Sequence, residues 1–114
     1  MKVESLRPFQ KKINVTVKAV SVTEPREVTS RLDDSQHRVA EALVGDETAC
    51  VLLTLWDDDI DKVLVGETYE IENAFTTLFK NSMRLNIGRY GTLKKSSQSI
   101  ETVNTSNNLS EKEF

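Results

Sequence analysis

Aromatic side chains with cations close behind them are the residues of this 114-residue chain whose types and spacing suit one chemistry, the binding of a nucleic-acid strand. Phe75 and Phe79 flank a predicted connection between two strands, and Lys80 and Arg84 follow them. Unpaired bases stack on aromatic rings at about 1 to 3 kcal/mol per base, and Lys or Arg neutralises the phosphates. Arg84 alternates with apolar neighbours, so we expect it to face away from the core.

Trp56 ends an apolar strand pattern, and its orientation depends on the alternation of that strand. Side chains of a strand point to opposite faces in turn, so Leu53 and Leu55 share one face and Trp56 belongs to the other. If the leucine face is the core, Trp56 points outward. Periodicity alone leaves two interpretations open, a ring that covers one end of a barrel and a ring that serves as an exposed stacking platform.

Phe75 does not fit an outward position by simple alternation. Counting by twos places it on the same side as Tyr69 and Ile71, which are expected in the core. A β-bulge near Asn73 would reverse the parity of the following residues, because a bulge inserts one extra residue into a strand. An outward Phe75 therefore predicts a bulge at that point.

Four aspartates follow Trp56 within five positions, at 57, 58, 59 and 61. Their oxygens could hold Mg²⁺ or Ca²⁺, but the segment lacks the central Gly and the later bidentate Glu of a calcium loop. Acids are favoured at a helix N-terminus, where they can also cap free N–H groups. We therefore expect a short helix over 57–63 that turns away from the aromatic face, and no metal site.

The residues that catalysis would need are sparse. His37 and Cys50 are the only residues of their types, they are far apart in sequence, and no motif links them. The glycines are spread over predicted turns and form no phosphate-binding loop. We expect no catalytic residues, no cofactor and no enzymatic activity, and we interpret Cys50 as a small buried hydrophobe.

Strand patterns position these residues on a small barrel. Five segments have apolar residues in the pattern of strands, and they lie at 11–23, 37–45, 49–57, 67–75 and 82–88. Five strands with one short helix between the third and fourth, and no alternation of strands with helices, predict an all-β, five-stranded closed barrel. Residues 24–36 contain Pro25 and an Asp-Asp-Ser cluster, which indicates a loop or protruding hairpin tip.

The charge distribution is uneven. The net charge is −3 and the sequence pI about 5.2, which is not the basic balance typical of nucleic-acid-binding domains. Residues 57–72 contain seven acids and one base, whereas residues 75–95 contain five bases and no acid. Binding depends on the charge of one surface, so the average does not exclude a polyanionic ligand.

The chain length predicts one domain over residues 1–95, followed by a flexible polar tail over 96–114. The tail is rich in Ser, Asn, Thr and Glu, and its last residues, SEKEF, also resemble an acidic hook ending in an aromatic. The N-terminus has no sustained apolar stretch of a signal peptide, so we expect a cytoplasmic location without membrane contact. Monomer is the default expectation for such a barrel.

Three longer strings carry a family resemblance. VGDETACVLLTLWDDD, VGETYEIENAFTTLFKNSMRLNIGRYG and the N-terminal SLRPFQKKINVTVKAV together resemble the single-OB-fold single-stranded DNA-binding proteins of archaea, above all the crenarchaeal type. The resemblance covers about residues 3–93 and extends to eukaryotic single-OB-fold relatives and replication protein A. It implies an OB-fold barrel that binds single-stranded DNA without sequence preference in replication, recombination and repair, and a nucleoid-associated location.

The resemblance also implies roles for individual residues. The family's three stacking aromatics match Trp56, Phe75 and Phe79, and its first-loop contacts match the set Arg26, Val28 and Arg31, with Arg38 or His37 near the second strand. Lys80 and Arg84 are added by charge and parity rather than by the resemblance.

This chain departs from the family pattern at several places. Ala49 and Asn81 stand where the family usually has Gly, the first loop is longer by an acidic LDDSQ, and the Gly/Arg-rich tail is absent. Two other functions stay open at this point, an RNA-binding OB protein and an OB module that docks replication or repair proteins through its acidic stretch or its tail.

Overall fold

The strands and helices follow one another as an almost entirely β chain. A computed structural model describes residues 1–29, 33–88 and 90–112. Its elements are η1 (Val3–Ser5), β1 (Ile13–Val22), β2 (Arg26–Thr29), β3 (Gln36–Gly45), β4 (Cys50–Trp56), α1 (Asp58–Lys62), β5 (Thr68–Phe79), β6 (Ser82–Asn86), β7 (Thr92–Lys95) and η2 (Leu109–Glu111).

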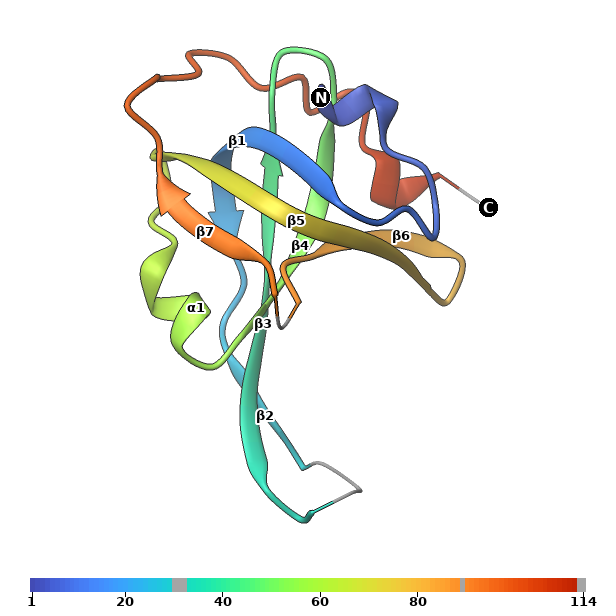
Figure 1. Ribbon diagram of the computed structural model, residues 1–114, viewed down its shortest axis with the longest axis vertical. Helices are drawn as coiled ribbons and strands as arrows, with labels where there is room; N and C mark the ends of the chain where they lie inside the picture. The colour runs from blue at the N-terminus through green and yellow to red at the C-terminus, as the bar shows by residue number, and fades with distance from the viewer. Residues whose placement is uncertain (30–32, 89, 113–114) are drawn as a thin grey trace.

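Five of these strands close a ring. β1 pairs with β3, β3 with β4, β4 with β6, β6 with β5, and β5 returns to β1 (Figure 1). Only the β4–β6 pair of this ring is parallel. The predicted all-β, five-stranded barrel with a short helix between its third and fourth strands is therefore confirmed. β2 pairs with β3, and β7 pairs with β5. Neither segment was predicted as a strand.

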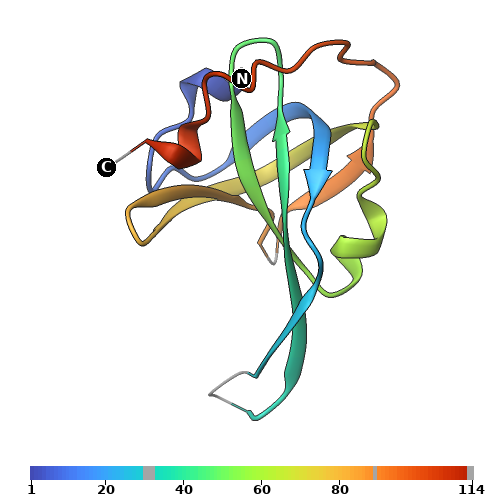
Figure 2. The same ribbon diagram turned by 180° about the vertical axis from the view of Figure 1, so that it is seen from behind.

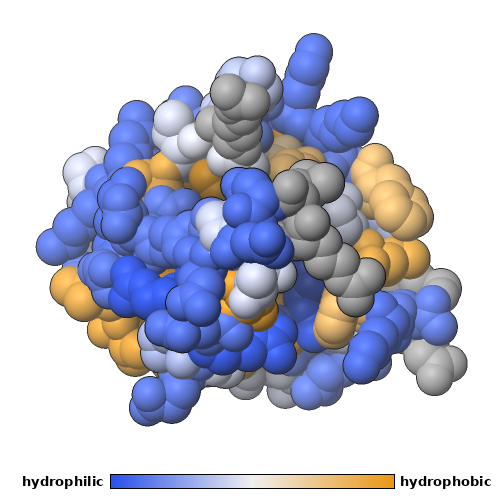
Figure 3. Space-filling model, turned by 90° about the horizontal axis from the view of Figure 1, so that it is seen from below, coloured by the Kyte–Doolittle hydropathy of each residue, from blue (hydrophilic) through white to orange (hydrophobic). Residues whose placement is uncertain are grey.

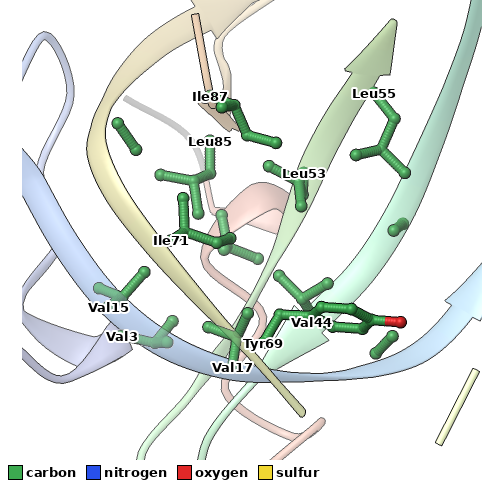
Figure 4. Packing of buried hydrophobic residues seen from close by; sticks show 14 of the residues in the cluster. Val3, Val15, Val17, Val44, Leu53, Leu55, Tyr69, Ile71, Leu85 and Ile87 are labelled. Carbon is green, nitrogen blue, oxygen red and sulfur yellow. The ribbon is translucent and has the colours of Figure 1, made fainter. Parts of the chain in front are cut away.

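Alternating apolar side chains fill the ring. Inward residues from different strands meet in one interior, as Figure 4 shows for Val17, Leu53, Ile71 and Leu85. Each of these side chains is almost fully buried, which contributes roughly 1.5 to 3 kcal/mol per large aliphatic residue. Cys50 is also buried and free, as expected for a small hydrophobe.

A β-bulge interrupts β5 near Asn73, where the sequence predicts one if Phe75 faces outward. Val15 of β1 pairs with Ile71, but Ile13 pairs with Ala74, so β5 has one more residue than β1 between these pairs. Asn73 adopts a positive φ of 56° and is exposed, while both Ile71 and Ala74 point inward. The residue after Ala74 therefore faces outward.

Two hairpins project from the barrel in different directions. The β2–β3 hairpin extends along the long axis of the molecule and the β5–β6 hairpin extends to one side (Figures 1 and 2). The turn between β5 and β6 is formed by Lys80 and Asn81, with φ of 51° and 65°. Positive φ at both turn residues is typical of tight two-residue hairpins, and Asn tolerates that conformation better than most residues. Asn81 can therefore form this turn at a position where the family usually has Gly.

The C-terminal segment differs from the flexible tail that its composition predicts. Described residues 96–112 run along the barrel; Leu109 is buried and η2 lies beside β4 and β6. The Ser110 hydroxyl accepts a hydrogen bond from Leu52 N at 2.9 Å and donates one to the carbonyl oxygen of Met83. The parallel β4–β6 ladder is short, and its free backbone groups need such partners, which a polar segment supplies. The aromatic end of the expected hook, at 114, lies outside the described residues.

α1 is a single short helix of five residues, held in place by the phenol of Tyr69. That hydroxyl accepts a hydrogen bond from Leu64 N at 2.7 Å and donates one to the carbonyl oxygen of Lys62 at 3.0 Å. In the described part of the chain, no helix combines the length and the apolar character that crossing a membrane requires.

Asp46 joins the two ends of the chain to the β3–β4 turn. Its carboxylate accepts hydrogen bonds from Val3 N, from Ala49 N and from both the backbone and the hydroxyl of Thr48, and its carbonyl accepts one from Asn104 N. Burial by itself would raise the pKa of Asp46, but these hydrogen bonds outweigh it and lower the pKa. The side chain is therefore held in its charged form inside the fold.

We predict that Asp46→Asn lowers the free energy of unfolding at neutral pH by about 1.5 to 3 kcal/mol, the range for hydrogen bonds to a charged group. A depressed pKa contributes stability above the unfolded value of about 3.9, and that contribution disappears as pH falls toward the folded pKa. The difference between wild type and variant, measured by urea unfolding, should therefore shrink below about pH 4. Glu47→Gln, which removes a neighbouring exposed ion pair with Lys2, is the control and should change little. A pH-independent difference would contradict the assignment.

Candidate functional site

A groove of about 260 Å³ crosses the outer face of the barrel between the two projecting hairpins. It is lined by side chains of five strands, among them Arg26, Val28, Glu41, Trp56, Phe79 and Arg84. Viewed from the β2–β3 hairpin end, apolar patches alternate with hydrophilic side chains on the surface (Figure 3). A surface of this kind can contact both the apolar and the charged parts of a ligand.

Strand register places Trp56 in this groove. Trp56 pairs with Val39 of β3, and Val39 pairs with Arg26 of β2, so these three side chains share the outer face. The Trp56 side chain is 47% exposed, while the preceding Leu55 is buried in the core. Of the two interpretations that periodicity left open, the geometry fits an exposed ring on the groove and not a cover over the barrel end.

Phe79 lies across the groove from Trp56, at the tip of β5, and is 53% exposed. Two cations flank its ring: the Nζ of Lys80 is 5.5 Å from the ring centroid, and the Cζ of Arg84 is 5.8 Å from it. Such distances are typical of cation–π contacts. The positive charges predicted to follow the aromatic residue are therefore beside its ring.

Phe75 points outward because of the bulge in β5, and its side chain is partly buried. Its ring lies over Gly88, where an added Cβ would be 2.6 Å from Cε1 of Phe75. Phe75 lines a second depression of about 250 Å³ rather than the groove itself. It pairs with Asn86, which lines the groove, so the two depressions adjoin across this pair.

Arg84 reaches the groove but is already paired with an acid. Its Nε lies 2.7 Å from Oε2 of Glu41, and its guanidinium donates a hydrogen bond to the hydroxyl of Ser82. None of the described residues donates a well-aligned hydrogen bond to that Glu41 oxygen, so the contact is an ion pair. Sequence reasoning missed Glu41, although an acid at an alternating position within the 37–45 strand pattern was a usable signal.

Of the two residues that the resemblance places near the second strand, His37 lies at the site and Arg38 does not. His37 lines a depression beside Trp56. Arg38 points to the other face, where it donates a hydrogen bond to Asp61 at 2.9 Å, and this bond raises the pKa of Arg38. Alternation along β3 separates the two, since adjacent residues face opposite sides. Arg31 lies outside the described residues.

Asp57 does not cap α1 as the acidic run predicts. It is the N-cap residue, but its carboxylate makes no capping hydrogen bond. Instead it accepts a hydrogen bond from Arg38 N at 2.9 Å and lies 2.8 Å from Nδ1 of His37, and both contacts lower the pKa of Asp57. Asp57 has a positive φ of 49° and stays beside Trp56, while the helix that follows turns away. Within the described ranges, no three potential metal ligands come together.

The charge separation seen in the sequence is reduced by pairing. Lys94 and Lys95 of β7 form ion pairs with glutamates of the acidic segment, at positions 67, 70 and 72. A larger depression elsewhere on the barrel, of about 480 Å³, is lined by Asp46, Glu47 and two of these glutamates. The described lining of that depression has more carboxylates than cations and includes no aromatic ring, so the aromatic groove is the better candidate for a polyanionic ligand.

Comparisons with known proteins agree with this geometry. Residues 6–95 match the family model described as single-stranded DNA binding protein Ssb-like, OB fold. The chain is 39% identical over 87 residues to the single-stranded DNA binding protein Ssb of Saccharolobus solfataricus, a match covering 76% of this chain and 57% of that protein. It therefore spans little more than half of that relative's length.

Solved structures show the same barrel. A hypothetical protein of Arabidopsis thaliana has a TM-score of 0.83 at 32% identity, covering 100% of this chain and 84% of that one. A replication protein A heterotrimer bound to single-stranded DNA has a TM-score of 0.73 over 91% of this chain and 27% of that one. At 13% identity the second likeness concerns the fold alone.

We predict that Gly88→Ala displaces the Phe75 ring, whereas Gly66→Ala does not. Both glycines have positive φ, so each substitution should cost about 1 to 2 kcal/mol of backbone strain. Only at Gly88 does the added Cβ meet a side chain, since nothing lies within 4 Å at Gly66. Gly88→Ala should therefore be the more destabilising change in urea unfolding, and it alone should shift the Phe75 ring resonances in NMR spectra. Unmoved Phe75 resonances in a folded Gly88→Ala protein would contradict the packing.

Proposed function

The chain belongs to the Ssb-like OB-fold family of single-stranded DNA-binding proteins, and from that premise we propose that it binds single-stranded DNA along the aromatic groove. The observation that carries the proposal is the pair of half-exposed rings, Trp56 and Phe79, facing the same groove with cations beside them. OB folds bind oligonucleotides on this barrel face and between the corresponding loops.

Stacking supplies the affinity that does not depend on sequence. Every base has a π face, so a base on Trp56 and another on Phe79 can be of any type. Phe75 would accept a further base next to the groove, and Val28 offers an apolar contact from the β2–β3 hairpin. Held on strands of a closed barrel, these side chains need little ordering when the ligand arrives.

Cations around the rings contact the phosphates. Arg26 and Lys80 are exposed at opposite sides of the groove, and neither has a carboxylate partner among the described ion pairs. Arg84 is shared between the ligand and Glu41, so it contributes less than a free arginine would. We keep Arg31 as a proposed phosphate contact on the basis of the resemblance. We do not assign this role to Arg38, because Asp61 holds its guanidinium on the other face.

The wider role follows from the family and is part of the proposal. The protein would protect exposed strands in replication, recombination and repair, in the cytoplasm and associated with the nucleoid, as a non-catalytic monomer. Docking of partner proteins through a flexible tail has little support, because Leu109 and Ser110 are buried against the barrel. Stacking tolerates either sugar, so competition between matched RNA and DNA oligomers decides the preference.

We predict that Trp56→Ala and Phe79→Ala each weaken binding of labelled oligo-dT by about fivefold to a hundredfold, the equivalent of removing one stacked base. Fluorescence anisotropy of the labelled oligomer measures this without relying on Trp56 itself. In wild type, binding should also quench Trp56 fluorescence and weaken as salt rises, because phosphate contacts release counterions. Leu64→Ala removes an exposed apolar side chain outside the groove and is the control. Absence of binding by wild type at micromolar concentration would overturn the proposal.

We predict that Glu41→Gln tightens binding roughly threefold to tenfold at low salt. The change removes a carboxylate from the groove and frees the Arg84 charge, and a like charge near a phosphate costs on the order of 1 kcal/mol. Glu27→Gln removes an exposed carboxylate on the opposite face of the β2–β3 hairpin and should have little effect. Weaker binding by Glu41→Gln would instead mean that Glu41 is needed to hold Arg84 in position.

A further inference from the structure

Beyond the groove, the barrel carries another cluster of aromatic and cationic side chains. The cluster consists of Lys11, Lys12, Phe75 and Tyr90 around the depression of about 250 Å³. It combines two cations with two aromatic rings, and among the described residues that line the depression there is no carboxylate. Neither the strand patterns nor the family resemblance assigns a role to Lys11, Lys12 or Tyr90. We refer to these four residues as the Tyr90 cluster.

The segment that precedes the two lysines is hydrogen-bonded to β5. Gln10 N donates a hydrogen bond to the hydroxyl of Thr76, Thr76 N donates one to the carbonyl of Gln10, and the Thr76 hydroxyl donates one to the carbonyl of Arg7. Thr76 is buried, so these hydrogen bonds anchor the segment before β1 to a rigid strand. Lys11 and Lys12 follow directly and are exposed, with Lys12 at a positive φ of 55°.

The bulge residue holds the other side of the cluster. The side-chain amide of Asn73 donates a hydrogen bond to the backbone carbonyl of Tyr90 at 3.3 Å. Tyr90 is 78% exposed, so most of its surface faces solvent and can be reached by a ligand. The same bulge that turns Phe75 outward thus also positions Tyr90 beside it.

The cluster continues the line of the groove. Phe75 and Phe79 lie four residues apart on the same face of β5, about 13 Å at the usual rise of a strand. The depression of the cluster begins at Phe75, on the side away from Phe79. A strand that leaves the groove past the Phe75–Asn86 pair therefore meets Tyr90 and the two lysines next.

Local charge also favours a phosphate at this end. In the groove, Glu41 offsets part of the charge of Arg84, whereas the described lining of the cluster's depression has two cations and no acid. The two exposed lysines make this depression electrostatically attractive to an anion. A phosphate group is the anion that a bound strand brings.

We propose that the Tyr90 cluster is a further subsite for the same nucleic-acid strand, in which Tyr90 stacks a base beyond Phe75 and Lys11 and Lys12 contact the flanking phosphates. This inference rests on the proposed function and extends it. The track then runs from Trp56 through Phe79 and Phe75 to Tyr90, and the cluster sets how many nucleotides one protein covers.

Oligomer length separates the cluster from the groove. Binding of labelled oligo-dT is measured over lengths from about 4 to 16 nucleotides, the range of OB-fold site sizes. Wild-type affinity should rise with length until the strand reaches the cluster. For Tyr90→Ala we expect unchanged affinity for the shortest oligomers, about fivefold or greater loss for the longest, and a plateau at a shorter length. For Lys11→Gln with Lys12→Gln, the salt slope on long oligomers should fall by about 0.7 for each phosphate that is no longer neutralised.

Matched variants keep the test decisive. Tyr90→Phe keeps the ring and should bind like wild type, and Lys18→Gln removes a lysine far from both depressions and should leave the salt slope unchanged. Thermal unfolding checks that each variant is folded. If wild type binds and the Tyr90 and lysine variants bind with the same affinity at every oligomer length, the proposed subsite is wrong, while the proposed groove is not affected. If these variants lose affinity equally at every length, a separate subsite is also wrong. If wild type binds no oligomer, the proposed function fails and the cluster with it.

Discussion

The β-bulge at Asn73 is the constraint on which the binding face depends. By inserting one residue into β5, it keeps Ile71 and Ala74 in the core and turns Phe75 to the surface, on the same side as Phe79. The same residue holds the backbone of the segment after β6 through its side-chain amide. Without the bulge, alternation would bury Phe75 and leave the following core positions outward. A conformation with positive φ, which Asn adopts more readily than most residues, is the local condition for this arrangement.

Contacts made by both chain-terminal segments hold the barrel together, and with it the face. Asp46 ties the first helical turn and the C-terminal segment to the β3–β4 connection, and Ser110 completes the short parallel ladder between β4 and β6. η1 and η2, the short helical turns near the two ends of the described chain, lie on the side away from the β2–β3 hairpin (Figures 1 and 2). Binding residues positioned by such a scaffold need little rearrangement, which reduces the entropic cost of ligand binding. Ser110 is also linked to the groove itself, because its carbonyl accepts a hydrogen bond from the hydroxyl of Ser82, which in turn accepts one from Arg84.

Electrostatics explains how a chain of net charge −3 can carry a site for a polyanion. Lys94 and Lys95 of β7, two of the five bases of the 75–95 segment, form ion pairs with glutamates away from the groove, and Arg38 pairs with Asp61 on the other face. At the groove, Arg26 and Lys80 remain beside the rings, while Glu41 moderates Arg84. In the proposed binding mode, stacking on the rings therefore supplies a large share of the affinity, and the few cations left unpaired among the described residues supply the phosphate contacts.

Local patterns in the sequence determined the five strands of the barrel and the short helix after Trp56, because alternation and turn chemistry act between near neighbours, and longer strings carried the family resemblance. For the Trp56 ring, alternation left two interpretations open. The sequence predicted the bulge only on the condition that Phe75 faces outward. Local patterns do not show which residue of β1 pairs with which residue of β5. Tertiary structure alone decided that Arg84 meets Glu41, that His37 rather than Arg38 lies beside Trp56, and that the polar C-terminal segment packs on the barrel. Each of these depends on pairing between distant segments. Register and unpaired backbone groups, which composition does not encode, determine those pairings.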